Sequence, residues 1–207
     1  MATKTSNGGD IVLKAYFNAK AAIWDETIAE KDTGKLTDMA GRLAIEPGFT
    51  VLDVGTGTGV FAPFILEKIG PKGRLVCLDI AEEMLKKLKA KRFPGNIEYL
   101  CADIADTRLS EGTFDAVICY SSFPHFRDKL KSLREARRVL KNGGLLFICH
   151  TSSRTAINDI HRQIPEVCND LIPEDEEMYR LLSAAGFKDI NIADNSSSYL
   201  ASAVKPE

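Results

Sequence analysis

The sequence predicts an α/β domain built on an open, doubly wound sheet of mainly parallel strands. Short apolar runs rich in Val, Ile, Leu and Cys alternate with amphipathic stretches whose apolar residues recur at helical spacing. Near-continuous apolar strands are typical of a parallel sheet that is covered on both faces. The repeated strand, helix, strand order with short connections favours the doubly wound arrangement.

The predicted strands and helices alternate along the chain, and clusters containing Gly or Pro separate them. The core strands are expected at 51–54, 74–78, 97–101, 116–120 and 145–149, and the helices between them at 61–69, 82–91 and 129–140. Clusters containing Gly or Pro at 70–73, 94–96 and 142–144 are expected to end these helices. Beyond residue 150 we expect a polar, partly helical insertion over 151–173, a helix over 174–185, and closing strands over 188–193 and 198–204.

Length and charge are those of one globular domain of 207 residues with a net charge of −2. We expect a flexible tail over 1–10, cap helices over 11–44, a core over 45–150, and an insertion with closing strands over 151–207. Nucleic acid is not an expected partner, because phosphate backbones are usually met by a strongly basic face. There is no run of about 18 apolar residues, so no membrane span is predicted.

The cysteines predict a reducing compartment. Five are present, which is an odd number, and no two are spaced as a CxxC pair. Four fall in or at the ends of predicted strands, where they are expected to be small, buried and reduced. The polar N-terminus has no apolar signal segment, and we therefore expect a cytoplasmic protein.

A glycine-dense turn after the first strand predicts a ligand site. Gly55, Gly57 and Gly59 permit positive φ and a close backbone approach, just before a helix N-terminus at the switch point of the sheet. A dinucleotide motif needs its third glycine at position 60, which is Val60 here. Asp53 would repel a pyrophosphate but suits a cationic head group. The turn therefore favours a positively charged ligand over NAD.

Residues 53–59 resemble the D-x-G-x-G-x-G motif of class I S-adenosylmethionine-dependent methyltransferases. The resemblance covers about 45–193 and is closest to the ubiquinone/menaquinone-biosynthesis-like small-molecule group. It implies a Rossmann-like, three-layer fold with seven strands, the last antiparallel. It also implies S-adenosylmethionine as cofactor, S-adenosylhomocysteine as product, and in-line methyl transfer to a small molecule.

The resemblance assigns roles to residues at the ends of the first two strands. Asp53 and Gly55 would lie near the amino-acid end of the cofactor. Asp79 would accept hydrogen bonds from the ribose hydroxyls, and Ile80 would pack on the adenine. On its own, Asp79 is equally well read as a helix cap before residues 81–83.

The next two strands complete the implied cofactor site. Asp103 would hydrogen-bond the adenine amino group with Ile104 beside it, although Asp103 alone is also read as a loop cap. Tyr120 ends the strand that opens onto the methyl group. The expected cofactor-binding residues are Asp53, Gly55, Thr56, Gly57, Gly59, Asp79, Ile80, Asp103, Ile104 and Tyr120.

Two histidines at strand ends are candidates for substrate chemistry. His125 and His150, with Tyr120, are expected to position the acceptor or to act as a base. The alternative is that they are polar residues at strand ends with no catalytic role. No metal is expected, although His150 and His161 with a nearby Cys or carboxylate form a weaker candidate site.

The substrate pocket is expected to include three aromatic residues that precede the core. Tyr16, Phe17 and Trp24 would form a wall able to attract a cationic sulfonium, or would simply pack an amphipathic helix on the sheet. Arg154 is a candidate contact for a polar acceptor, or a solvated loop residue. His125 and His150 complete the predicted pocket.

Two other functions remain open from the sequence. One is an NAD-type oxidoreductase, which the glycine spacing opposes. The other is a methyltransferase-like binding or regulatory protein without turnover. The sequence names neither the acceptor nor the atom that is methylated, and it leaves a monomer and a homodimer equally open.

Overall fold

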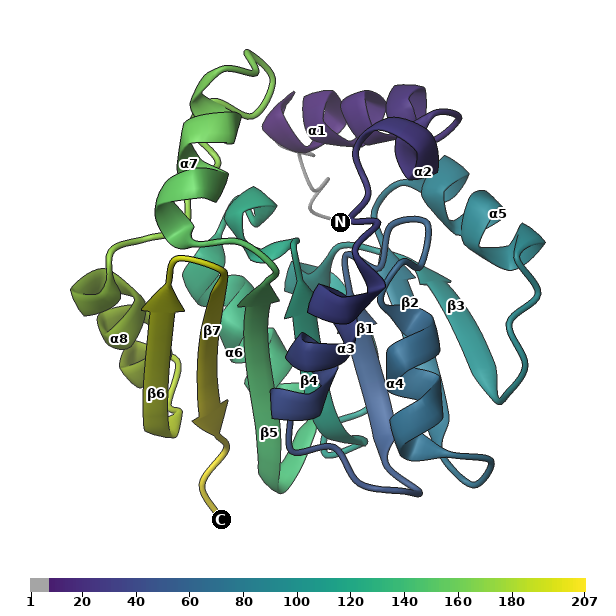
Figure 1. The fold of residues 1–207 in the computed structure, drawn as a ribbon. Helices are drawn as coiled ribbons and strands as arrows, with labels where there is room; N and C mark the ends of the chain where they lie inside the picture. Colours follow the sequence, from purple (N-terminus) through teal and green to yellow (C-terminus); the bar gives the residue numbers. More distant parts are fainter. Residues whose placement is uncertain (1–7) are drawn as a thin grey trace, which may run out of the picture.

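A computed structural model describes residues 8–207 and shows one seven-stranded sheet in the order β3-β2-β1-β4-β5-β7-β6 (Figure 1). Strands β1 to β5 pair in parallel, and β7 runs antiparallel to both β5 and β6. The strands are β1 Thr50–Val54, β2 Arg74–Asp79, β3 Ile97–Cys101, β4 Phe114–Tyr120, β5 Leu140–His150, β6 Lys188–Asn195 and β7 Ser198–Val204. The predicted doubly wound fold with an antiparallel last strand is confirmed.

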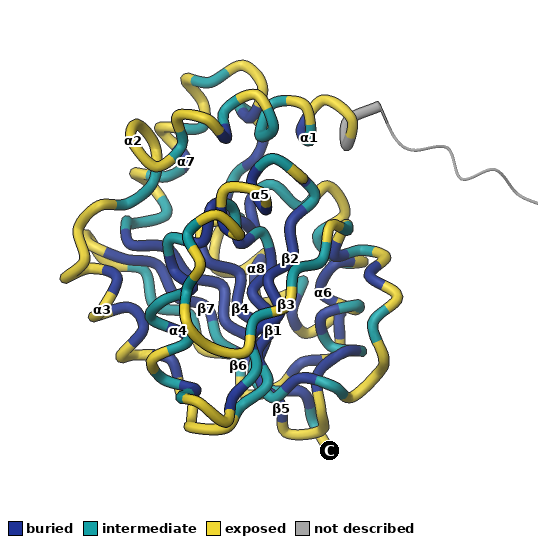
Figure 2. Tube along the Cα trace, turned by 90° about the vertical axis from the view of Figure 1, so that its right-hand side faces the viewer, coloured by how far each residue is buried: buried dark blue, intermediate teal, exposed yellow. Residues whose placement is uncertain are grey.

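Helices cover both faces of the sheet and form the three expected layers. The helices are α1 Gly8–Lys20, α2 Trp24–Thr27, α3 Thr33–Arg42, α4 Ala62–Ile69, α5 Glu82–Ala90, α6 Lys129–Val139, α7 Arg154–Arg162 and α8 Asp175–Ala184. Helices α3, α4 and α5 share one hydrophobic core with the sheet, and α6 and α8 share the other. In Figure 2 the buried residues are concentrated along the strands, and the exposed residues lie mostly at the periphery.

Alternation along the strands divides the side chains between these two cores. In β1, Val51 packs on the α4 face, whereas Leu52 and Val54 pack on the α6 face. Successive side chains of a strand point to opposite faces, so a strand buried on both sides is apolar throughout. The apolar runs read from the sequence therefore correspond to real strands.

The start of β5 corrects one expectation. Residues 142–144 were expected to end a helix, but α6 ends at Val139 and these residues lie inside β5. The register with β4 shifts there, from Phe114 opposite Leu140 to Ala116 opposite Leu145. The extra residues bulge from the ladder, and Gly143 adopts φ 73°. A glycine pair thus marks a bulge here instead of a helix end.

The N-terminal tail and Cys101 differ from what the sequence predicts. The predicted tail over 1–10 overlaps α1, which begins at Gly8, because this segment continues the amphipathic helix; residues 1–7 lie outside the described residues. All five cysteines are free, but Cys101 at the end of edge strand β3 is exposed and Cys168 is only partly buried. No helix within residues 8–207 is long and apolar enough to cross a membrane.

The N-terminal segment lies over the carboxyl ends of the parallel strands. Helix α1 lies above the arrowheads of the parallel strands, at the same end of the sheet as α7 (Figure 1). Asn18 Oδ1 accepts a hydrogen bond from Glu83 N at 3.0 Å, which caps the first turn of α5 from another helix. Asp25 accepts from Thr58 Oγ1 in the glycine turn and pairs with Lys91 Nζ at 2.8 Å. These contacts tie the N-terminal helices to the ligand edge of the sheet.

Candidate functional site

The glycine turn after β1 is tight at one end and open in the middle. The backbone N–H groups of Gly55 and Thr56 both donate to Leu78 O, at 2.7 and 3.0 Å. Gly55 has φ 68°, and a Cβ there would lie 2.4 Å from Ser122 Cβ. Gly57 has φ 55° and open space where its Cβ would be. The turn therefore presents backbone at Gly57 with room for a ligand.

Asp79 ends β2 and faces this turn. Its Oδ2 accepts from Gly57 N at 2.8 Å, and its Oδ1 accepts from Ala81 N at 2.8 Å. The residue is 7% exposed, and burial raises the pKa of its carboxyl to about 6. Asp79 thus organises two backbone segments and still lines the cavity beside them. The helix-cap interpretation and the ligand interpretation are compatible in this geometry.

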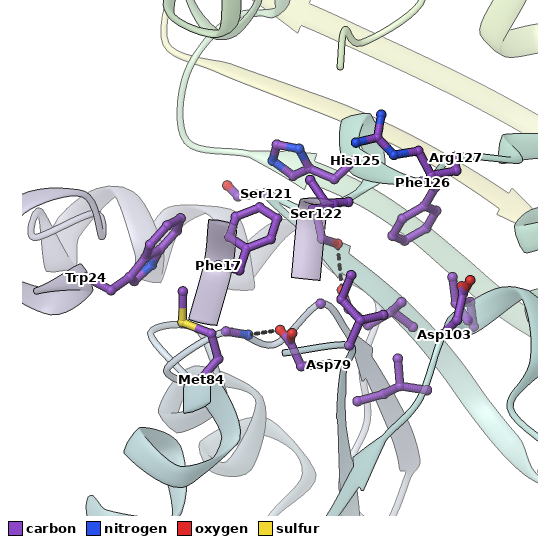
Figure 3. Close-up of a pocket in the computed structure, with 17 residues that line it drawn as sticks. Phe17, Trp24, Asp79, Met84, Asp103, Ser121, Ser122, His125, Phe126 and Arg127 are labelled. Atoms are coloured by element: carbon purple, nitrogen blue, oxygen red, sulfur yellow. Dashed lines mark hydrogen bonds between the residues drawn. The ribbon is translucent and has the colours of Figure 1, made fainter. Parts of the chain in front are cut away.

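A cavity lies between the turn, the end of β2, α1 and the loop after β4. Apolar and aromatic side chains line it together with a few polar groups, as is common in small-molecule and cofactor sites. Figure 3 shows Phe17 between Trp24 and His125, with Asp79 below them and Asp103 at one end. The lining residues that were not named individually from the sequence are Leu13, Val54, Leu78, Met84, Ser121, Ser122, Phe126 and Arg127.

Six of the ten expected cofactor residues line this cavity: Gly55, Gly57, Asp79, Ile80, Asp103 and Ile104. Asp103 also accepts from Ala105 N at 2.8 Å and caps a short 3₁₀ helix, Ile104–Asp106. The three hydrophobic side chains Ile80, Ile104 and Leu78 add apolar surface to the lining. The structure therefore brings together residues from the ends of β1, β2 and β3, as the sequence suggested.

Asp53, Thr56 and Gly59 lie behind the cavity wall. Asp53 points to the same face of the sheet as Val51. Its Oδ2 accepts from Thr56 Oγ1 at 2.6 Å, and burial raises its pKa to about 7. A Cβ on Gly59 would lie 2.1 Å from Leu88 Cδ1, so this glycine serves close packing against α5. These residues shape the turn but do not line the cavity.

Tyr120 is placed away from the cavity as well. Its ring stacks on Phe61 with 4.5 Å between centroids, on the α4 face of the sheet. Its hydroxyl is 3.0 Å from Thr151 Oγ1, and burial raises its pKa to about 12. Strand alternation points this side chain to the wrong face for contact with the cavity. The next residues, Ser121 and Ser122, line the cavity instead.

Of the three histidines, only His125 lines the cavity. His150 is 1% exposed, and neither ring nitrogen has a hydrogen-bond partner within the described residues. Burial lowers the pKa of His150 to about 3, so its ring is neutral. His161 Nδ1 bonds to Asp170 O, which makes it part of the insertion's internal structure. His150 was expected in the pocket, but β5 buries it against Tyr199.

We expect the His150→Leu variant to be as stable as the parent, or more stable by about 1–3 kcal/mol. The substitution removes two buried nitrogen atoms that lack hydrogen-bond partners. Urea unfolding measures the change, and S-adenosylmethionine binding should be unaltered. A large loss of stability would show that these nitrogens are hydrogen-bonded in solution.

The aromatic wall is present in part. Phe17 and Trp24 line the cavity and lie edge to face, with 5.6 Å between ring centroids. Tyr16 does not line the cavity, and Lys20 Nζ lies over its ring, 5.9 Å from the ring centroid. Arg154 is also outside, because it pairs with Glu174, Asp175 and Asp194 around the start of α7. Helix periodicity places Phe17, but not its neighbour Tyr16, toward the site.

The electrostatics of the turn fit S-adenosylmethionine. Asp79 brings a buried carboxyl group to the cavity, and Asp53 places a second one behind the turn. Arg127 is the one Lys or Arg in the described cavity lining, and it lies across the cavity near Phe126 (Figure 3). A pyrophosphate would meet repulsion here, whereas an ammonium and ribose hydroxyls would find acceptors. Among residues 8–207, no cluster of three or more His, Cys, Asp or Glu side chains is suited to hold a metal ion.

Comparisons with known proteins agree with this chemistry. A methyltransferase domain family matches residues 52–148. The ubiquinone/menaquinone biosynthesis C-methyltransferase UbiE of Idiomarina loihiensis is 28% identical over 174 residues, covering 71% of this chain and 69% of that protein. UbiE of Teredinibacter turnerae is 31% identical over 149 residues, covering 67% of this chain and 60% of that protein. The crystal structure of a SAM-dependent methyltransferase from Aquifex aeolicus matches with a TM-score of 0.72 at 22% sequence identity. The match covers 90% of this chain and 97% of that one.

The matched region spans 60% to 69% of the length of those two relatives. The structural match, below 25% identity, shows the fold. These comparisons favour neither an NAD-type oxidoreductase nor a protein without turnover. The chain belongs to the class I S-adenosylmethionine-dependent methyltransferases, with S-adenosylmethionine as its cofactor, and resembles the UbiE group.

Proposed function

We propose that this protein transfers the methyl group of S-adenosylmethionine to a small-molecule acceptor. The observation that carries the proposal is the shared cavity, which joins Asp79 and Gly57 on one side to His125 and Phe17 on the other. A cofactor site and a nucleophile site must adjoin for direct transfer. The capped, partly aromatic cavity suits a small acceptor, and the net charge of −2 gives no support to a nucleic-acid substrate.

The proposed cofactor contacts follow the cavity from one end to the other. Gly55 and Gly57 would meet the amino-acid end through backbone atoms, and Asp79 would accept from the ribose hydroxyls. Asp103, with Ile80 and Ile104, would hold the adenine. Asp53 and Thr56 would act indirectly, because their mutual hydrogen bond supports the turn from behind.

Bound S-adenosylmethionine supplies an activated methyl carbon on a positively charged sulfur. The protein then has two tasks, which are to hold the nucleophile in line with that carbon and to exclude water. Alignment at near-attack distance supplies about 7–11 kcal/mol of the barrier. Phe17 and Trp24 close the cavity from the cap, and their ring faces would attract the sulfonium charge.

We further propose a cytoplasmic protein that works as a monomer or homodimer. Five free cysteines support a reducing compartment. The relatives are named as C-methyltransferases of quinone biosynthesis, which makes aromatic ring compounds the first acceptors to test.

Cofactor binding should weaken as the pH falls from 7 to 5.5. Burial raises the pKa of Asp79 to about 6 and that of Asp53 to about 7. A cationic, hydroxyl-bearing ligand favours the ionised carboxyl, so binding lowers these pKa values and releases a proton. Affinity then declines by at most about tenfold per pH unit for each coupled proton. Calorimetry in buffers of different ionisation enthalpy measures the release, and a pH-independent affinity would contradict this account.

Turnover tests the proposed function itself. The full chain is incubated with S-adenosylmethionine and a panel of hydroxyl, amine, thiol and ring-carbon acceptors, and S-adenosylhomocysteine is quantified by mass spectrometry. We expect acceptor-dependent product, which forms more slowly at sub-saturating S-adenosylmethionine when Asp79 is replaced by Asn. Tight cofactor binding with no product for any acceptor would favour a binding protein without turnover.

A further inference from the structure

The loop after β4 and the insertion after β5 meet at the cavity through one short contact. His125 Nδ1 lies 2.9 Å from Asp170 Oδ2, although 45 residues separate them in the sequence. The side chain of Asp170 is 6% exposed and that of His125 is 15% exposed. His125 lines the cavity, whereas Asp170 stands behind it. A carboxylate is therefore held against the cavity's only lining imidazole.

Asp170 is fixed from several directions. Arg127 donates to Asp170 Oδ1 at 3.0 Å, so each carboxyl oxygen has a separate partner. Asp170 N donates to Val167 O at 2.8 Å. Ile172, two residues after Asp170, is held by the side-chain amide of Asn158. Asn158 Nδ2 donates to Ile172 O at 3.0 Å, and Ile172 N donates to Asn158 Oδ1 at 2.8 Å. The insertion thus folds back on itself and holds this carboxylate in place.

The contact selects the reactive nitrogen of His125. An ionised carboxylate can only accept hydrogen bonds, so Nδ1 carries the proton and donates it to Asp170. In the neutral ring, Nε2 then keeps its lone pair. Among residues 8–207, the hydrogen bond found for the His125 ring is the one at Nδ1. The ring lines the cavity, and its Nε2 is a basic nitrogen without a protein partner in that part of the chain.

The surroundings of His125 favour its neutral form. Burial lowers its pKa below 6.5, the bond to Asp170 opposes that effect, and nearby His161 and Lys129 also lower the pKa. Lys129 Nζ donates to Pro124 O and Phe126 O. At pH 7 the base form is present. The charged or titratable groups facing this ring are Asp170, Arg127, Lys129, His161 and, within the sheet, His150.

Aromatic side chains lie beside the His125 ring in the cavity lining. Phe17 meets the His125 ring edge to face with 5.0 Å between centroids, and Trp24 continues the wall behind Phe17 (Figure 3). Such a wall suits a planar ring. A phenolic proton, with a pKa near 10, is within reach of an imidazole base, whereas an aliphatic hydroxyl is a far weaker acid.

Resting on the proposed function, we propose that His125 and Asp170 form a dyad that removes the hydroxyl proton of an aromatic acceptor. His125 touches the acceptor, and Asp170 is a positioning residue that fixes the tautomer and stabilises the imidazolium. Asp170 is not among the site residues expected from the sequence. The aromatic acceptor is the class already chosen for testing under the proposed function.

The hydroxyl proton passes to His125 Nε2, and its electron pair stays on the acceptor. A pair from the aryl oxygen, or from a ring carbon conjugated to it, forms the bond to the methyl carbon. The carbon–sulfur bond breaks, and its pair remains on sulfur as a neutral thioether. The proton later leaves His125 for solvent. After attack by carbon, the methylated ring carbon loses its proton and the oxygen takes one up, which restores the aromatic ring and the hydroxyl.

Histidine NMR tests the dyad without any acceptor. With only three histidines, ¹⁵N-labelled protein gives resolvable ring signals, and single variants assign them. We expect His125 in the Nδ1–H tautomer with a pKa below 6.5, and a lower pKa in Asp170→Asn because the carboxylate raises it. An Nε2–H tautomer, or a His125 pKa unaffected by Asp170→Asn, would overturn the dyad.

Kinetics test the substrate class with 1,4-dihydroxynaphthalene and its 1,4-dimethoxy analogue, which has no hydroxyl proton, under anaerobic conditions. We expect product only from the first. His125→Gln should lower kcat by about 10²–10⁴-fold with cofactor affinity unchanged. Asp170→Asn should lower kcat on the order of tenfold or more and move the acid limb of the pH profile to lower pH. Asp159→Asn, an exposed carboxylate paired with Arg162 on α7, is the matched control and should leave kcat unchanged.

The outcomes separate this inference from the proposed function. Turnover of amine or thiol acceptors alone would refute the aromatic hydroxyl class and leave methyl transfer standing. Turnover of the naphthalenediol that is insensitive to both variants would refute the dyad. Cofactor binding without turnover of any acceptor would refute the inference and the proposed function together.

Discussion

Replacing Asp79 with Asn should weaken S-adenosylmethionine binding by about 10- to 100-fold, which corresponds to the roughly 1.5–3 kcal/mol of a hydrogen bond to a charged group. The amide keeps the size of the carboxyl but offers one acceptor atom instead of two. Its NH₂ group would face a backbone donor, either Gly57 N or Ala81 N, each of which now lies 2.8 Å from a carboxyl oxygen. The ribose hydroxyls would also lose a charged acceptor.

The matched control for Asp79 is Glu98→Gln. Glu98 carries an exposed carboxylate on the neighbouring strand β3 and pairs with Arg74 on the surface. The same loss of one charge there should leave cofactor affinity unchanged within error. Calorimetric titration of both variants with S-adenosylmethionine measures the two affinities. Equal affinities in Asp79→Asn and the parent would remove Asp79 from the proposed site.

Gly55→Ala should lower the free energy of unfolding by about 2–5 kcal/mol. An alanine at φ 68° costs about 1–2 kcal/mol. Its methyl group would also lie 2.4 Å from Ser122 Cβ, and such overpacking costs about 1–3 kcal/mol. For a chain of this size, that change lowers Tm by about 4–20 °C, which thermal unfolding can measure.

Gly57→Ala provides the contrast within the same turn. Its φ of 55° carries a similar backbone cost, but its Cβ meets no atom within 4 Å. Stability should fall by only about 1–2 kcal/mol, whereas cofactor binding should be largely lost because the methyl group occupies ligand space. Equal stability losses in the two variants would show that the turn is not tight at Gly55.

The fold could be read from the sequence because its strongest signals are local. An apolar strand buried on both faces, a glycine turn and an amphipathic helix each depend on neighbouring residues, and together they specify the doubly wound sheet. The residues that line the cavity at the ends of β1, β2 and β3 were also accessible, because parallel strands end at one edge. Asp79 is the clearest example.

The remaining features depend on side-chain direction and on long-range folding. Tyr120 and His150 end their strands at the predicted edge, but alternation and pairing with β7 turn them into the interior. Asp53 supports the turn from behind for the same reason. Asp170 approaches His125 only because the insertion folds back, and no spacing in the sequence signals that return. Strand ends can be located from sequence, whereas the face that each side chain occupies is less certain.

The most direct test of the central claim is a calorimetric titration of the full chain with S-adenosylhomocysteine and, separately, with NADH. The cavity between Gly57, Asp79 and His125 predicts one S-adenosylhomocysteine bound per chain, with affinity sharply reduced in Asp79→Asn, and no heat with NADH. Saturable binding of NADH, or no binding of S-adenosylhomocysteine by the folded protein, would contradict the account.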